Sequence, residues 1–70
     1  MYREYIVDRI AALEAEKQAV GLSAFALMGI NGRIALLEAS LAEYDDLVAR
    51  GFTIVGMTSG DRPTWQVSAP

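Results

Sequence analysis

The stretch LMGINGRIALLEASLAEYDDLVARG, residues 27–51, carries the clearest structural pattern of this chain. Its apolar side chains recur at alternating spacings of three and four residues, which places them along one face of an α-helix. This set, called the apolar seam below, comprises Leu27, Ile30, Ile34, Leu37, Leu41, Tyr44 and Val48. The glycine at its end readily takes the left-handed conformation that terminates a helix. The pattern predicts an amphipathic helix over about residues 24–50.

A second helix is predicted before the seam. Ile6, Ile10 and Leu13 share one helical face, but the next position on that line is Lys17. The change indicates that a first helix, over about residues 2–20, is separate from the seam helix. We expect Lys17 to lay its aliphatic stem along the edge of the helix contact.

The break between the two helices has two candidate positions. Val20-Gly21-Leu22-Ser23 combines a glycine suited to ending one helix with a serine suited to capping the next. Gly29-Ile30-Asn31-Gly32 is the alternative. We favour the first, although it leaves Gly29 and Gly32 inside the second helix, where each costs about 1 kcal/mol relative to alanine. Those glycines would then mark a kink or the close approach of another helix.

Residues 52–67, FTIVGMTSGDRPTWQV, predict a C-terminal β-hairpin. Two runs rich in β-branched and aromatic residues flank a turn-forming segment, residues 59–63. Alternation groups the side chains on three strand faces: Phe52 with Ile54, Val55 with Met57, and Trp65 with Val67. An isolated two-stranded hairpin is marginal in water, so one apolar face should dock on the helices and the other should contact a partner. In the alternative, the helix ends and residues 68–70 cover both faces.

The predicted fold is therefore α+β, an antiparallel helical hairpin followed by a two-stranded β-hairpin, in a single domain of residues 1–70. A chain this short buries only about 60% of the surface that its unfolded form exposes. It contains no cysteine and no histidine, so neither disulfides nor a Cys/His zinc site can add stability. Apolar residues make up 53% of the chain, which predicts that some face another chain.

We therefore expect a protein partner or a homo-oligomer. The interface predicted from the seam and the hairpin comprises Leu27, Ile30, Ile34, Leu37, Leu41, Val55, Met57 and Trp65.

Charge and hydropathy argue against two kinds of partner, nucleic acid and the membrane interior. The net charge is −3 and the six cations are scattered without forming a run, so we do not expect nucleic-acid binding. The longest uncharged stretch, residues 18–32, has 15 residues, fewer than the about 20 that cross a bilayer, so we expect no membrane span. The charged N-terminal stretch lacks the pattern of a secretory signal. We expect a cytoplasmic or virion-associated protein.

One cluster of carboxylates raises the question of chemistry. Glu43, Asp45 and Asp46 lie near the end of the second helix. Adjacent helical positions point about 100° apart, so Asp45 and Asp46 do not converge, and Glu43 with Asp46 would share a metal only weakly. A solvated acidic face is expected instead. Without an imidazole or a gathered acid and base, we predict a non-enzyme with no catalytic residues, no metal and no cofactor.

The seam's end and the hairpin carry one family resemblance. LAEYDDLVARG, residues 41–51, followed by TIVGMTSGDRPTWQV resembles the helix-glycine-hairpin portion of the small W-type head-to-tail joining proteins of tailed bacteriophages. It spans about residues 41–67. Those proteins follow the hairpin with a second helix, whereas this chain carries its extra helix before the shared part. The resemblance implies a phage-particle subunit held between larger proteins, and it assigns no functional residue.

Three functional hypotheses follow. The first, which we favour, is a structural subunit of a larger assembly, such as a phage virion, that uses the seam and the hairpin as contacts. The second is a small inhibitor or adaptor that binds one regulatory or defence protein through a Met57/Trp65 surface. The third is an oligomeric binder of a small molecule, with a pocket between helices and with Arg33 and Arg62 as anion contacts.

Overall fold

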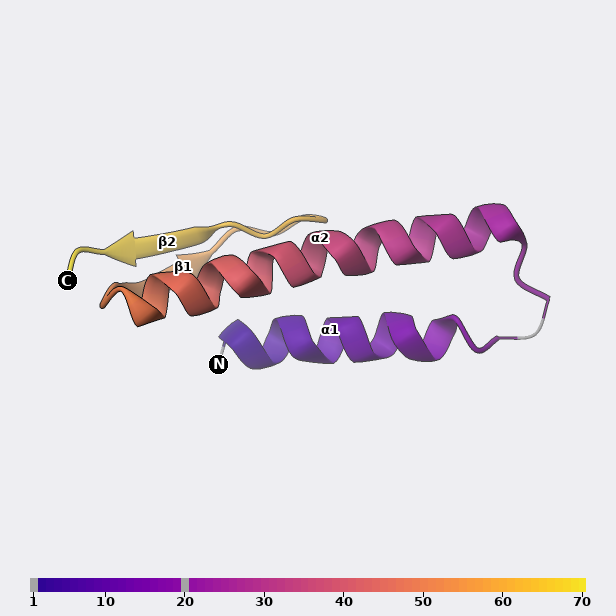
Figure 1. Cartoon of the computed structure of the whole chain (residues 1–70), viewed down its shortest axis with the longest axis horizontal. Coiled ribbons are helices and arrows are strands. Elements are labelled where there is room, and N and C mark those ends of the chain that lie inside the picture. Colours follow the sequence, from indigo (N-terminus) through magenta and orange to yellow (C-terminus); the bar gives the residue numbers. More distant parts are fainter. Residues whose placement is uncertain (1, 20) are drawn as a thin grey trace.

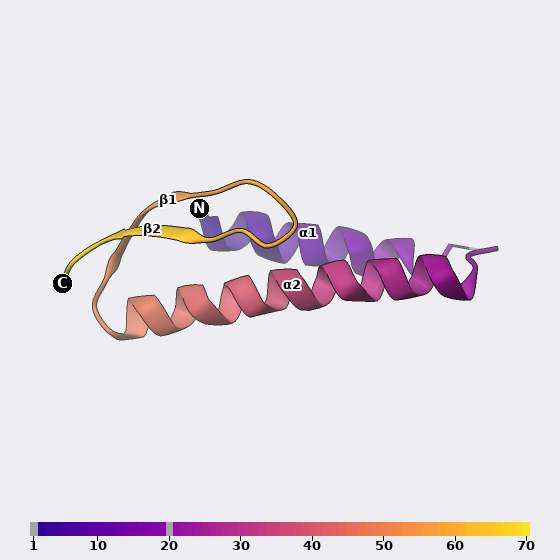
Figure 2. The same cartoon turned by 90° about the horizontal axis from the view of Figure 1, so that it is seen from above.

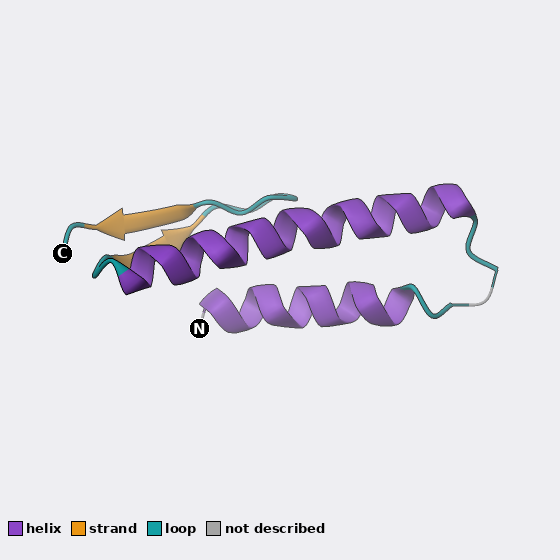
Figure 3. Ribbon diagram, in the orientation of Figure 1, coloured by secondary structure: helices purple, strands orange, loops and turns teal. Residues whose placement is uncertain are grey.

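The computed structural model describes residues 2–19 and 21–70. Its elements are α1 (Tyr2–Glu16), α2 (Ala24–Ala49), β1 (Thr53–Met57) and β2 (Trp65–Ser68). The two helices run antiparallel, and the strands fold back along the C-terminal half of α2 (Figures 1 and 3). This arrangement confirms the predicted α+β fold of a helical hairpin followed by a β-hairpin.

The first helix is shorter than predicted. α1 ends at Glu16, and the amides of Gln18 and Ala19 bond to carbonyls three residues back, at 3.1 Å each. This tighter winding is typical of a helix end that is closing rather than continuing. The predicted end at Val20 lies outside the described residues.

The connection lies at the first of the two predicted positions. Gly21 has a φ of +87°, in the left-handed region that favours glycine. The Ser23 side chain accepts a hydrogen bond from the Ala26 amide at 3.1 Å, which caps α2. Gly29 and Gly32 lie inside α2, and apart from the adjacent backbone of α2 itself, no atom of the described chain lies within 4 Å of a Cβ built on either. These two glycines therefore accommodate no close contact inside this chain.

The end of α2 has the hydrogen bonds of a Schellman motif. Gly51, with a φ of +90°, donates to the Val48 carbonyl at 3.0 Å, and Phe52 donates to the Leu47 carbonyl at 3.0 Å. Because this motif satisfies the last carbonyls of α2 while reversing the chain, it directs β1 back along the helix.

The core is formed where α1, α2 and the hairpin meet. Its buried side chains are Ile6, Leu13, Ile30, Ile34 and Leu37. Partly buried residues pack around them: Ile10, Leu22, Leu41, Met57 and Trp65. The middle of the apolar seam is thus the intramolecular core, while Val48 at its end is exposed.

A β-bulge changes the hairpin from the predicted alternation. Ile54 pairs with Val67 and Gly56 pairs with Gln66, so Val55 is an extra residue in the antiparallel register. Val55 and Met57 were expected on one face, but Met57 packs against the core while Val55 is 56% exposed. Period-two alternation fails here because it assumes an uninterrupted ladder.

The chain is elongated. Its radius of gyration is 14.0 Å, compared with about 11 Å for a compact chain of this length.

α2 is long and apolar enough to cross a membrane, although 22% of its most apolar window is buried in this structure. Length and composition alone do not separate a membrane span from a core helix.

Candidate interaction surfaces

Trp65 and Ser40 attach the hairpin to α2. The Trp65 indole Nε1 donates to the Ser40 main-chain carbonyl at 2.8 Å, and the fully buried Ser40 hydroxyl donates to the Pro63 carbonyl at 2.6 Å. The Trp65 ring also meets Tyr44 edge-on, with centroids 4.9 Å apart. These contacts turn Trp65 inward, and Met57 also packs against the core. The prediction that Met57 and Trp65 form an outward surface is therefore corrected, because both side chains stabilise this chain's own fold.

The residues predicted as an interface fall into three groups. Ile30, Ile34 and Leu37 are buried in the core. Four are half-buried: Leu27, Leu41, Met57 and Trp65. Val55 remains well exposed. The structure therefore places most of the predicted set inside one chain and leaves only Val55 on an open surface.

A different face of α2 carries Phe25 and Met28, the two most exposed large apolar side chains of the described residues, together with the partly exposed Leu36. Phe25 is 86% exposed, Met28 is 71% exposed and Leu36 is 39% exposed. Phe25, Gly29, Gly32 and Leu36, called the outer stripe below, recur at spacings of four, three and four and so share one helical face. α1 and the hairpin both lie on one side of α2, and no other described element runs along its opposite side (Figure 2). From the sequence, Gly29 and Gly32 were predicted only to mark a kink or the close approach of another helix.

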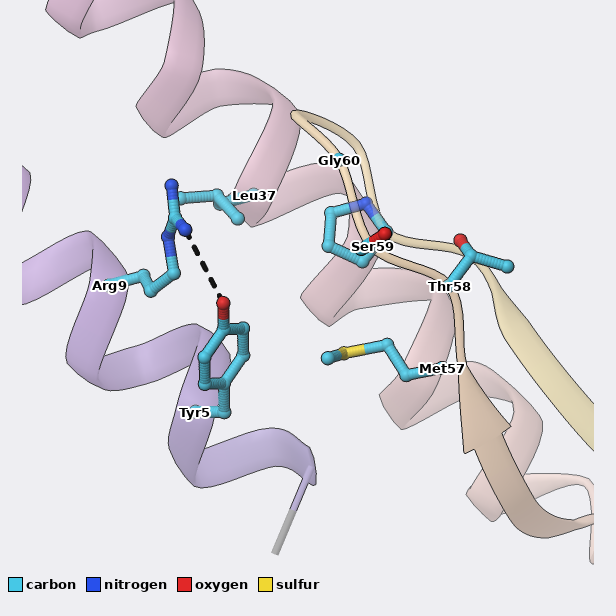
Figure 4. Close-up of a pocket in the computed structure, with 8 residues that line it drawn as sticks. Tyr5, Arg9, Leu37, Met57, Thr58, Ser59 and Gly60 are labelled. Atoms are coloured by element: carbon cyan, nitrogen blue, oxygen red, sulfur yellow. Dashed lines mark hydrogen bonds between the residues drawn. The ribbon is translucent and has the colours of Figure 1, made fainter.

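A small pocket opens where α1 meets the hairpin turn (Figure 4). It has a volume of about 90 Å³ and is lined by Tyr5 and Arg9 of α1, Leu37 of α2, residues 57–60 and Pro63. Arg9 Nη1 donates to Tyr5 Oη at 3.3 Å along the α1 side of the pocket. The pocket therefore offers a cation and a phenol above an apolar floor.

The cations expected to bind an anion are not part of this pocket. Arg62 lies 3.7 Å from the Glu43 carboxylate, and neither Arg62 nor Arg33 lines the pocket. Spacing along the chain does not show which cation α1 brings to the turn. Arg9 has that position.

The acidic residues near the end of α2 each lie beside a cation. Asp45 pairs with Arg3 at 3.0 Å, and Asp46 pairs with Arg50 at 3.1 Å. The hydrogen bond from Arg3 to Asp45 is the main cause that raises the pKa of Arg3. In residues 2–19 and 21–70, no group of three or more potential metal ligands gathers. These pairs are exposed, so they contribute little to stability.

Comparisons with protein-family models, with curated proteins and with solved structures found no match for this chain. Two features of the surface point to a function. One is the exposed apolar face of α2, and the other is the pocket beside Arg9.

Proposed function

We propose that this protein is a non-enzymatic structural subunit that contacts other protein chains within a larger assembly. The observation that carries the proposal is the uncovered face of α2, where most of the surface of Phe25 and Met28 is exposed. Burying a side chain of this size contributes about 1.5–3 kcal/mol. A partner on this face would therefore add substantially to the stability of a chain with a small core.

The shape of the molecule supports the same proposal. Its accessible surface is 4654 Å², compared with about 4,300 Å² for a compact monomer of its mass. Its longest dimension is 48 Å and the other two are 18 and 17 Å. A thin, extended subunit of this kind presents a large surface relative to its volume, which suits a part held between other chains.

The phage-protein resemblance of residues 41–67 favours a virion as the assembly, with the protein located in the cytoplasm before incorporation. The inhibitor or adaptor alternative is weaker, because it relied on a Met57/Trp65 surface that packs against the core. Val55 is the exposed hairpin residue left for such a partner.

Density-gradient sedimentation of an extract from the cells that produce this chain tests the proposal. An antibody against the chain should detect it in high-mass fractions of a density gradient, at constant stoichiometry with the other proteins of the same particle. Particles carrying the Phe25→Gln variant should hold less of it than particles carrying Val55→Gln. Recovery of all the protein at the top of the gradient would contradict the proposal.

The pocket favours a second function, the binding of a small molecule. Arg9 and Tyr5 suit a carboxylate, and the apolar floor suits a short aliphatic group, although the volume is below the about 150 Å³ of a cavity that holds benzene. Titration of short carboxylic acids, followed by the thermal midpoint, would test it. Stabilisation that Arg9→Gln abolishes would support this function, and an unchanged midpoint would contradict it.

A further inference from the structure

The outer stripe has the same sequence of spacings whether it is followed from its N-terminal or its C-terminal end. From Phe25 to Leu36 the order is large, small, small, large, with intervals of four, three and four residues. A two-fold axis midway between Gly29 and Gly32 would therefore superpose the stripe of one α2 on that of an antiparallel copy. In that arrangement Phe25 meets Leu36 of the second copy, and the glycines meet each other at the crossing.

The glycines supply the shape that such a crossing needs. Large side chains on both helices would hold the axes about 8–10 Å apart, whereas facing glycines allow a closer approach. A Cβ at either glycine would contact nothing in the described chain beyond the adjacent backbone of α2, so the space above them is open to a second helix. Gly29 and Gly32 cost α2 about 1 kcal/mol each relative to alanine, and contacts within the chain do not offset that cost.

The distribution of charge selects the antiparallel orientation. Beyond Leu36, the same side of α2 continues to Glu43 and Asp46. Glu43 lies 3.7 Å from Arg62 and Asp46 lies 3.1 Å from Arg50. These exposed ion pairs are weak, so a parallel pair that brings the carboxylates against their own copies is still the less favourable one. An antiparallel pair centred between Gly29 and Gly32 places the two acidic ends at opposite ends of the dimer, because each lies beyond the start of the other α2.

We infer that the outer stripe binds a second copy of this chain, forming an antiparallel α2–α2 dimer that crosses at Gly29 and Gly32. The inference rests on the proposed function, since it names the first contact by which the subunit assembles. Phe25 to Leu36 spans about 16 Å of helix, and the contact is therefore smaller than the about 800 Å² per partner of a standard interface. We expect dissociation constants on the order of micromolar or weaker.

Engineered cysteines test the orientation directly, because the chain has no native cysteine. The Phe25→Cys protein is mixed with a Leu36→Cys protein that carries a mass tag, in a glutathione redox buffer. The mixed dimer retains one unaltered Phe25–Leu36 contact. We expect the mixed disulfide to exceed both homodisulfides by about tenfold, since each homodisulfide would join positions some 16 Å apart in the antiparallel pair.

A second comparison, between two glutamine substitutions, tests whether the disulfide depends on the helix crossing at Gly29 and Gly32 or forms by chance encounters. Gly32→Gln restores helix propensity but places a long side chain at the crossing, whereas Ala15→Gln makes a like addition on exposed α1. Introduced into both cysteine proteins, Gly32→Gln should lower the mixed disulfide by about tenfold, and Ala15→Gln should leave it unchanged.

Three outcomes would overturn the inference. Dominant homodisulfides would show a parallel pair, and a mixed disulfide only about twice as abundant as each homodisulfide, the statistical ratio for equal amounts of the two proteins, would show random collision. Flotation of the native chain with phosphatidylcholine vesicles, as a monomer, would show that a bilayer covers the stripe. Co-sedimentation with a particle would then still support the proposed function, so failure of the dimer and failure of that function remain distinguishable.

Discussion

Ser40 and Trp65 are joined by a hydrogen bond in which the indole N–H donates to the Ser40 carbonyl at 2.8 Å. The Ser40 hydroxyl in turn donates to the Pro63 carbonyl, two residues before Trp65, at 2.6 Å. Ser40 of α2 therefore accepts one hydrogen bond from the hairpin and donates another to it. Together the two bonds set the position of the hairpin along α2.

Ser40→Ala should destabilise the fold by about 1–3 kcal/mol, because it leaves the Pro63 carbonyl without its donor in a buried site. Urea unfolding, followed by circular dichroism, measures the loss. Ser68→Ala is the matched control, since Ser68 is exposed at the end of β2. Equal stability of the two variants would show that water replaces the hydroxyl at no cost.

Trp65→Phe should cost about 0.5–1.5 kcal/mol from the lost hydrogen bond, and further stability from the smaller ring against Tyr44. The double variant with Ser40→Ala should be less destabilised than the sum of the two single variants, because both bonds position the same segment. Unfolding free energies of all four proteins form the required cycle. Strict additivity would mean that the two bonds act independently.

Met57→Glu and Val55→Glu distinguish the inward from the outward side of the bulged strand. Met57 packs against the core, so its replacement by glutamate should lower stability by about 2 kcal/mol or more. Val55 is exposed, and its replacement should change stability by no more than about 0.5 kcal/mol. Thermal unfolding of the two proteins makes the comparison, and a reversed order would contradict the register.

Gly21→Ala and Gly29→Ala should change stability in opposite directions. Gly21 has a positive φ, so alanine there should destabilise the turn by about 1 kcal/mol. Gly29 lies in a helix with open space around its Cβ position, so alanine there should stabilise a dilute monomer by about 1 kcal/mol. Urea unfolding at low protein concentration measures both. Two changes of the same sign would contradict the assignment of the turn.

The sequence allowed the main elements to be predicted because they depend on local signals. The seam from Leu27 to Leu41 has the three-four period of a helix, and Gly21 and Ser23 have the chemistry of its N-terminal turn. These signals act within a few residues of each other. The fold class and the turn could therefore be predicted before any contact was known.

The surfaces could not be predicted in the same way, because they depend on contacts between distant segments. Val55 forms a β-bulge only through the register of β1 with β2. The Ser40 hydroxyl donates its hydrogen bond only because the hairpin brings the Pro63 carbonyl next to it. Burial of the seam by α1 also decides which face of α2 remains open. Phe25 and Gly32 could have been recognised by searching α2 for a second regular spacing outside the seam.

Sedimentation equilibrium of the purified native chain, over about a hundredfold range of concentration, tests directly whether α2 carries an association surface. We expect an average mass that rises from 7.6 kDa towards about 15 kDa, twice the mass of one chain, with Phe25→Gln shifting the rise to higher concentration. A folded protein of 7.6 kDa at every concentration would contradict self-association through this face.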